Sequence, residues 1–165
     1  VRIVASAALA SRAAPVIVVT GHRQEEVAAA LAGLPVETAF NPDYAEGLST
    51  SLRRGFSALP ESARAAVVML GDMPLVGAAA VDRLIGAWEA GGRPAAVVPL
   101  VEGRRANPVL LSRALEADVE KLTGDRGAGP LLAQRGDVLE VAMDDPALLA
   151  DVDTPDMLAA LTRSV

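Results

Sequence analysis

The sequence predicts an α/β domain in which a mainly parallel sheet is covered by helices. Three continuous apolar runs carry no polar alternation, which is typical of strands buried on both faces of a sheet. These runs are residues 15–19, 65–70 and 95–100. Segments whose apolar residues recur about every 3.6 positions separate the runs, as in amphipathic helices. Because strands and helices alternate, we expect parallel strands joined by right-handed crossovers.

The remaining elements follow from the same periodicities. Helical spacing is found in residues 27–34, 48–59, 81–88 and 111–122. The third of these helices has the most regular apolar stripe, which ends at Trp88. Residues 36–40 and 138–143 indicate two further strands. A last helix is predicted to start at Thr154, because Thr is a favourable N-cap and Pro155 suits the first helical position.

Residues 101–112 interrupt the alternation of strands and helices. We interpret them as a hairpin-like excursion. Pro108 should keep this segment off a central strand, because proline cannot donate a hydrogen bond to a neighbouring strand.

The composition narrows the class of protein. A chain of 165 residues fits a single domain, which we assign to residues 1–165. The absence of cysteine excludes a disulfide framework, a thiolate metal site and a cysteine nucleophile. A net charge of −6 argues against binding a nucleic-acid polymer, although one small nucleotide remains compatible with it. No run approaches the 18 or so apolar residues of a membrane helix, and we expect a cytoplasmic protein.

The first candidate for chemistry is Asp72, in the turn Gly71 to Pro74 after the strand 65–70. In open parallel sheets, ligands bind beyond the carboxyl ends of the strands. A carboxylate at such a place suits Mg²⁺, which takes oxygen ligands and usually only one or two from the protein. The alternative is an aspartate that only satisfies the amides of its turn.

A second acidic segment follows the strand 138–143. Asp151 and Asp153 alternate with Val152, so both carboxylates point to one side if the segment is extended. Taken alone, they are better explained as solvated residues ahead of a helix. They are, however, the only other acidic cluster beside an end of the sheet, where a second ligand would be needed.

The loop 41–55 opens a helix and is the candidate nucleotide loop. Gly47 permits close approach of the backbone, and Ser49, Thr50 and Ser51 bring hydroxyl and amide groups to a helix N-terminus. Such an end attracts anions. The alternative is a single N-cap serine.

Taken together, these segments resemble one family. Five segments occur in the same order in the MobA-like nucleotidyltransferases, and specifically in the molybdenum cofactor cytidylyltransferases. They are NPDYAEGLSTSLRRG, VVMLGDMPLV, GRRANPVLLS, LTGDRGAGPLL and ADVDTPDMLAAL. The resemblance runs from about Pro15 to the end of the chain, and the order of five motifs is far more specific than any one of them.

The resemblance implies a Rossmann-like, three-layer α/β/α nucleotidyltransferase fold. It also implies transfer of CMP from CTP to the terminal phosphate of the molybdenum-bound pterin cofactor, with release of pyrophosphate and with Mg²⁺ as the metal. The expected partners are CTP, the pterin cofactor and, as recipient, a molybdoenzyme or its chaperone, with no nucleic-acid polymer and no membrane.

The resemblance also implies roles for individual residues. Asp72 and Asp153 match the two metal-binding, catalytic aspartates of the family. The positions that match the loop facing the nucleotide are Gly47, Ser49 and Ser51. The positions that match the segment facing the pterin are Arg105, Asn107 and Pro108.

The sequence departs from the family in two places. The opening signature, a strand and a phosphate-binding loop ending in Lys, is absent, and Lys121 lies in a helical pattern where it cannot replace that Lys. We therefore expect residues 1–165 to fold with a vacant strand position inside the sheet and to have little activity. In addition, Gly129 stands where relatives often carry Arg.

Other functions remain open from the sequence alone. One is a non-catalytic nucleotide-binding accessory domain, and another is a related nucleotidyltransferase that uses GTP or another phosphate acceptor. A phosphatase with an aspartyl nucleophile is a weaker alternative, because the only Asp-x-Asp, from Asp151 to Asp153, comes last in the chain.

Overall fold

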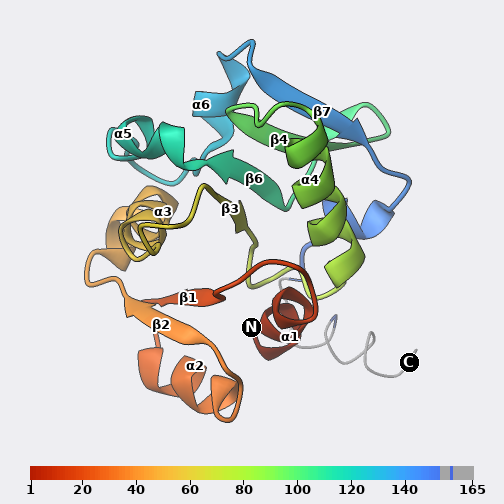
Figure 1. The fold of residues 1–165 in the computed structure, drawn as a ribbon. Helices are drawn as coiled ribbons and strands as arrows, with labels where there is room; N and C mark the ends of the chain where they lie inside the picture. The colour runs from red at the N-terminus through yellow and green to blue at the C-terminus, as the bar shows by residue number, and fades with distance from the viewer. Residues whose placement is uncertain (153–156, 158–165) are drawn as a thin grey trace.

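The computed structural model describes residues 1–152 and Met157, and its helices and strands alternate along most of the chain (Figure 1). The strands are β1 (Ile17–Thr20), β2 (Glu37–Phe40), β3 (Ala65–Val68), β4 (Ala96–Val101), β5 (Arg104–Arg105), β6 (Val109–Ser112) and β7 (Val138–Ala142). The α-helices are α1 (Arg2–Leu9), α2 (Gln24–Leu31), α3 (Leu48–Ser57), α4 (Ala78–Ala90), α5 (Glu116–Val119) and α6 (Gly129–Ala133). The described residues also form the 3₁₀ turns η1 (Tyr44–Glu46), η2 (Arg113–Leu115) and η3 (Pro146–Leu149). The last helix predicted from Thr154 lies outside the described residues.

The strands form two separate sheets. In the smaller one, β1 pairs with β2 in parallel. The larger one has the order β3-β6-β4-β5, with β7 on β4. Among the described strands, β4–β7 is also parallel, whereas β3–β6, β4–β5 and β4–β6 are antiparallel. The α/β class holds, but the expectation of a mainly parallel sheet does not, because a strand covered by helices on both faces has the same continuous apolar pattern in either direction.

The strand β6 also corrects two details of the sequence interpretation. Residues 101–112 do form an excursion, in which β5 folds back on β4, but β6 then enters the sheet between β3 and β4. Pro108 immediately precedes β6, where a missing N–H does not disturb the pairing. The helix predicted over 111–122 is shorter than expected, because Leu111 belongs to β6 and the helical turns start only after Ser112.

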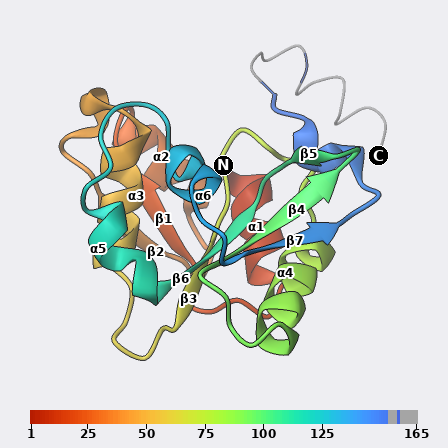
Figure 2. The same ribbon diagram turned by 90° about the horizontal axis from the view of Figure 1, so that it is seen from above.

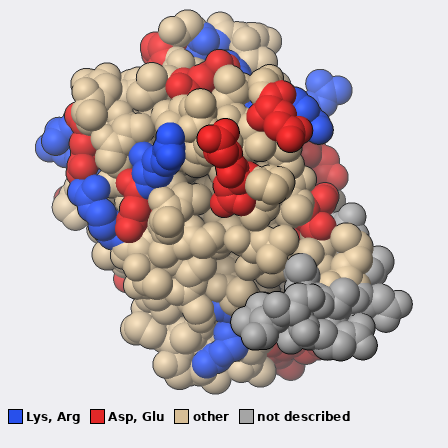
Figure 3. Space-filling view, turned by 90° about the vertical axis from the view of Figure 1, so that its right-hand side faces the viewer, with Lys and Arg blue, Asp and Glu red and all other residues tan. Residues whose placement is uncertain are grey.

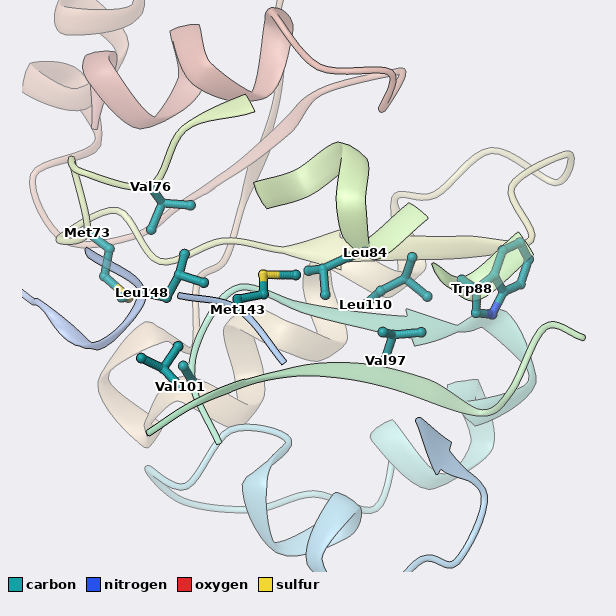
Figure 4. Packing of buried hydrophobic residues seen from close by; sticks show 10 residues of the cluster. Met73, Val76, Leu84, Trp88, Val97, Val101, Leu110, Met143 and Leu148 are labelled. Atoms are coloured by element: carbon teal, nitrogen blue, oxygen red, sulfur yellow. The ribbon is translucent and has the colours of Figure 1, made fainter. Parts of the chain in front are cut away.

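Two hydrophobic cores lie on the two faces of the larger sheet (Figure 2). Alternate residues of β4 contribute to each, as the period of a strand requires. Val97 and Val101 belong to the core that also contains Leu84 and Trp88 of α4, and Figure 4 shows Val97 near Leu110 and Val101 near Leu148. Ala96 and Val98 belong to the second core, with residues of α3, α5 and α6. Helices therefore cover both faces of this sheet.

Helix α1 and the residues that follow it connect helix α2, beside the smaller sheet, to helix α4, beside the larger sheet. The guanidinium of Arg2 donates to the carbonyl oxygens of Ala30 and Ala32 at the end of α2, at 2.8 and 3.0 Å. After α1, the backbone N–H of Arg12 donates to Asp82 of α4 at 2.7 Å. These contacts hold the two sheets in one unit although β1 and β3 do not pair.

On the face that Figure 3 shows, the surface carries charges of both signs. Basic and acidic side chains lie next to one another in the upper half of that face, and uncharged residues cover much of its centre. No helix within the described part of the chain combines the length and apolar character needed to cross a bilayer.

Candidate functional site

A cavity of about 690 Å³ lies between β1 and β3. Most of its wall is apolar and comes from β1, β3, α1 and α3. Besides the backbone, the described residues that give it polar side chains are Ser51, Arg105, Asn107 and Arg126. These four residues come from α3, from the segment between β4 and β6, and from the turn before α6. The cavity thus combines an apolar interior with neutral and cationic groups.

The loop before α3 is fixed by a buried hydrogen-bond network around Asn41, a residue that is 2 % exposed. Its amide nitrogen donates to Thr50 Oγ1 at 2.8 Å and to Ser51 Oγ at 3.1 Å. Its amide oxygen accepts from the backbone N–H of Asp43 at 3.0 Å. Because its bonds satisfy a buried polar group, Asn41 sets where Ser51 lies at the cavity wall.

The N-terminus of α3 is occupied by a turn from elsewhere in the chain. The N–H of Leu48 donates to Asp125 Oδ1 at 3.0 Å, and the N–H of Ser49 donates to the carbonyl oxygen of Gly124 at 3.1 Å. We call these two bonds the 48–125 latch. They satisfy amides that a helix end would otherwise offer to a ligand. The first turn of α3 is therefore not the free anion site that the sequence suggested.

Gly47 makes the latch possible. Its φ of 111° lies in the region that favours glycine. A Cβ at this position would come within 2.6 Å of the carbonyl carbon of Gly124 and 2.7 Å of its oxygen. The sequence predicted that another group would come close to the backbone of Gly47. In the structure, the 124–125 turn is the segment that does so.

Asp72 lies on an exposed turn beyond the end of β3. The buried side chains of Met73 and Val76 anchor this turn in the core. The carbonyl oxygen of Asp72 accepts from the N–H of Val152 at 2.8 Å. The second acidic segment therefore runs beside Asp72, with the exposed Asp151 next to the contact, whereas Asp153 lies outside the described residues.

The carboxylates at this place suit a divalent metal as far as the described residues extend. Asp72 and Asp151 are exposed, and among residues 1–152 no side-chain hydrogen bond or ion pair is found for either. Within residues 1–152, no three His, Asp or Glu side chains gather into a metal-binding group. This donor set fits a divalent ion, such as Mg²⁺, that is bound by few protein oxygens.

The arginines at the cavity differ in their contacts. Arg105 Nε donates to Glu140 at 2.8 Å and its Nη1 donates to the carbonyl oxygen of Leu132 at 3.1 Å, which ties β5 to β7 and α6. Arg126 is exposed, and no hydrogen bond or ion pair is found for its side chain within the described residues. Arg126 is thus the cavity's available cation.

The structure brings some predicted residues together and separates others. Ser51, Arg105 and Asn107 line the same cavity. Gly47, the buried Ser49 and the buried Pro108 do not line it. The sequence reasoning missed Arg126 and Asp125. Their motif, TGDRGAG, had a detectable signal, since a charged pair between glycines indicates a turn with an exposed function.

Comparison with known proteins identifies the fold and the family. The family model described as "MobA-like NTP transferase domain" matches residues 1–141. The chain belongs to this family. It is therefore a nucleotidyltransferase domain with the α/β nucleotidyltransferase fold.

Individual relatives agree with this assignment. The molybdenum cofactor cytidylyltransferase of Escherichia coli (strain K12) is 29% identical over 143 residues, which are 86% of this chain and 70% of that protein. The crystal structure of Rv0371c from Mycobacterium tuberculosis H37Rv has a TM-score of 0.82 and 27% identity, covering 98% of this chain and 83% of that one. A complex of Rv0371c with manganese has a TM-score of 0.79 and 26% identity, covering 99% and 86%.

Proposed function

We propose that this nucleotidyltransferase transfers CMP from CTP to the phosphate of the molybdenum-pterin cofactor. An oxygen of the cofactor's terminal phosphate attacks the α-phosphorus of CTP and forms the new P–O bond. The bond from the α-phosphorus to the oxygen that bridges to the β-phosphorus breaks, and pyrophosphate leaves with that oxygen. Such a reaction needs alignment of the two phosphates and neutralisation of their charge more than covalent chemistry.

The observation that carries the proposal is the cavity that Ser51, Arg105, Asn107 and Arg126 line together. The first belongs to the loop motif that resembles the cytidylyl branch, and the next two belong to the motif that resembles the pterin-facing segment. The name of the Escherichia coli relative, a molybdenum cofactor cytidylyltransferase, supports the same substrates.

Within this proposal each group has a distinct task. Ser51 and Arg126 bind phosphate oxygens of the nucleotide. Arg126 supplies a positive charge in place of the arginine that relatives often carry at the position of Gly129. Arg105 and Asn107 orient the pterin phosphate. Asp72 holds Mg²⁺ from the turn after β3, together with an acid of the adjacent segment, for which the motif favours Asp153. When bound, Mg²⁺ neutralises the charge that develops on the leaving pyrophosphate.

Titration calorimetry tests the nucleotide assignment. The protein is titrated with CTP and with GTP, each in the presence and in the absence of Mg²⁺. CTP with Mg²⁺ should bind most tightly. Tighter binding of GTP would overturn the choice of base, and the absence of any nucleotide binding would overturn the site. In a protein that carries the family's phosphate-binding loop ahead of Val1, binding of CTP without transfer to a pterin acceptor would favour the accessory-domain alternative.

Two variants test the assigned residues. Asp72→Asn should remove the effect of Mg²⁺ on CTP affinity, whereas Asp144→Asn, another exposed aspartate of the chain, should not. Arg126→Ala should weaken CTP binding by about 10- to 100-fold, which corresponds to one charge-assisted hydrogen bond. Arg104→Ala removes an exposed arginine that does not line the cavity and serves as the control.

A further inference from the structure

A second pocket, of about 450 Å³, lies at the other end of the larger sheet from the turn of Asp72. Arg64, which lines it, immediately precedes β3, whereas Asp72 follows the opposite end of that strand. Figure 4 shows the same separation across the core, with Trp88 at one end and Met73, the residue after Asp72, at the other. Among the described residues, only Ala63 lines both this pocket and the larger cavity. The second pocket is therefore distinct from the candidate active site.

Three arginines line this second pocket, which we call the arginine pocket: Arg64, Arg93 and Arg113. Arg113 is held in the wall, because its Nη1 donates to the carbonyl oxygen of Pro60 at 2.7 Å and its Nε lies 3.3 Å from Glu116 Oε2. Arg64 and Arg93 are exposed, and within the described residues no side-chain hydrogen bond or ion pair is found for either. Two guanidinium groups of one pocket thus have no anionic partner in the described part of the chain.

The backbone holds Arg93 in an uncommon conformation at this pocket. Its φ of 61° lies in the region that favours glycine. Its backbone N–H donates to the carbonyl oxygen of Trp88 at 2.9 Å, and its guanidinium carbon lies 5.4 Å from the centre of the Trp88 ring. A cation above an aromatic ring is attracted by the electrons of the ring and keeps its N–H groups for other partners. The structure therefore fixes a guanidinium at the pocket and leaves its donors available.

The lining of the arginine pocket suits a small anion that carries phosphate. Guanidinium donors match phosphate oxygens in both geometry and charge. The hydroxyl oxygen of Ser112, another lining residue, accepts from the N–H of Ala114 at 3.3 Å, so its own proton is available to an acceptor. The exposed Glu61 also lines the pocket, and its carboxylate should oppose an anion. The volume lies within the range of small-molecule sites, roughly 300–1,000 Å³.

We propose that the arginine pocket binds a small phosphate-bearing anion through Arg64, Arg93 and Ser112. Pyrophosphate represents this class, because it carries phosphate groups and no base. The net charge of −6 on the chain disfavours such an anion over most of the surface, so binding depends on the local arginines. The inference does not rest on the proposed transfer of CMP, because Arg64, Arg93 and Ser112 do not line the cavity of the candidate active site.

The fluorescence of Trp88 tests this proposal. Trp88 is the only tryptophan of the sequence, and it lines the arginine pocket but not the larger cavity. The protein is titrated with pyrophosphate in the absence of divalent metal and at constant ionic strength. The emission should change and reach saturation, and calorimetry should give the same affinity. The absence of saturable binding in both measurements up to millimolar pyrophosphate would overturn the proposal.

Variants of the two available arginines test the assigned contacts by calorimetry. Arg64→Ala and Arg93→Gly should each weaken pyrophosphate binding by about tenfold or more, as expected for the loss of one charge-assisted hydrogen bond. Arg93→Gly should still fold, because glycine suits the backbone at this position. Arg104→Ala, which removes an exposed arginine outside the pocket, is the matched control and should bind like the wild type. Unchanged affinity in both pocket variants would overturn the proposal.

Glu61→Gln tests the role of charge in the opposite direction. Removing this carboxylate should tighten pyrophosphate binding by about two- to fivefold, which is the effect of one exposed charge. A purely structural role of the pocket residues does not predict tighter binding. Weaker binding of pyrophosphate by this variant would overturn the proposal.

The place and the chemistry of the ligand are tested separately. Arg126→Ala, at the larger cavity, should leave the Trp88 response to pyrophosphate unchanged, and loss of the response in this variant would place the anion in that cavity and overturn the proposal. Cytidine should give no response, since it has no phosphate, and competition by cytidine would also overturn it. Tighter binding of a hexaglutamate peptide than of pyrophosphate would identify an acidic protein partner instead.

Discussion

Replacement of Gly47 by alanine tests the packing that places the candidate nucleotide loop. The φ of 111° and ψ of 174° at this residue suit glycine almost alone, and imposing them on alanine costs about 1–3 kcal/mol. The new Cβ would also lie 2.6 Å from the carbonyl carbon of Gly124. Because this neighbour is backbone, the 124–125 turn must move, which sacrifices the bond from Ser49 and adds about 0.5–1.5 kcal/mol. We expect unfolding to become easier by about 2–4 kcal/mol in total.

Urea unfolding followed by circular dichroism measures this loss. Gly86→Ala is the matched control, because Gly86 lies inside α4 and a Cβ there meets nothing within 4 Å. That variant should be unchanged or more stable by up to about 1 kcal/mol. If Gly47→Ala unfolds at the same urea concentration as the wild type, the close approach of the 47 and 124 backbones is not a constraint, and the reasoning about the latch is wrong.

Substitutions at three further positions are tested by the same unfolding measurement. Asp125→Ala should cost about 0.5–2 kcal/mol by uncapping α3, and Asp125→Asn, which keeps an oxygen, should cost less; equal losses would contradict the capping role. Asn41→Ala should cost about 2–4 kcal/mol because it removes three hydrogen bonds from a buried site, and a loss below that of Asp125→Ala would contradict this. The hydrogen bonds from Arg135 lower the pKa of Asp137 from its ordinary value of 3.8. The charged Asp137 therefore stabilises the folded protein above pH 3.8, and this stabilisation is lost as the pH falls through the lower pKa of the folded state. Asp137→Asn should be less stable than the wild type at neutral pH but equally stable in strong acid.

Much of the fold was predictable because local pattern and burial agree. The run 95–100 became β4, whose alternate residues enter both cores, and the stripe ending at Trp88 became α4. The direction of the strands was not predictable in this way. The Val109–Ser112 strand contains apolar residues at positions that also fit a helix including Leu115 and Val119, and only its pairing with β3 and β4 decides between the two.

The sequence also predicted some features of the candidate site and missed others. The resemblance assigned Ser51 to the loop that faces the nucleotide and Arg105 and Asn107 to the segment that faces the pterin, and all three residues line one cavity. Motif order also placed the segment of Asp151 beside Asp72, and the bond from Val152 to Asp72 agrees with that neighbourhood. Chain direction predicts a site at the end of β3 beside Asp72, whereas the nucleotide-facing and pterin-facing roles of the other residues come from the resemblance to the family and stay predictions.

The role of the α3 N-terminus was not predictable, and the reason is physical. A helix start offers free amides in any sequence, so the segment around Ser49 by itself favours anion binding. Whether those amides remain free depends on a partner 77 residues away, since Asp125 already supplies the carboxylate that the helix end attracts. Because Asp125 binds there, the first turn of α3 holds the 124–125 turn instead of an external anion. Arg126, the next residue, lies at the cavity wall. The phosphate binding that we propose for Arg126 thus depends on Asp125, whose carboxylate is bound at the N-terminus of α3.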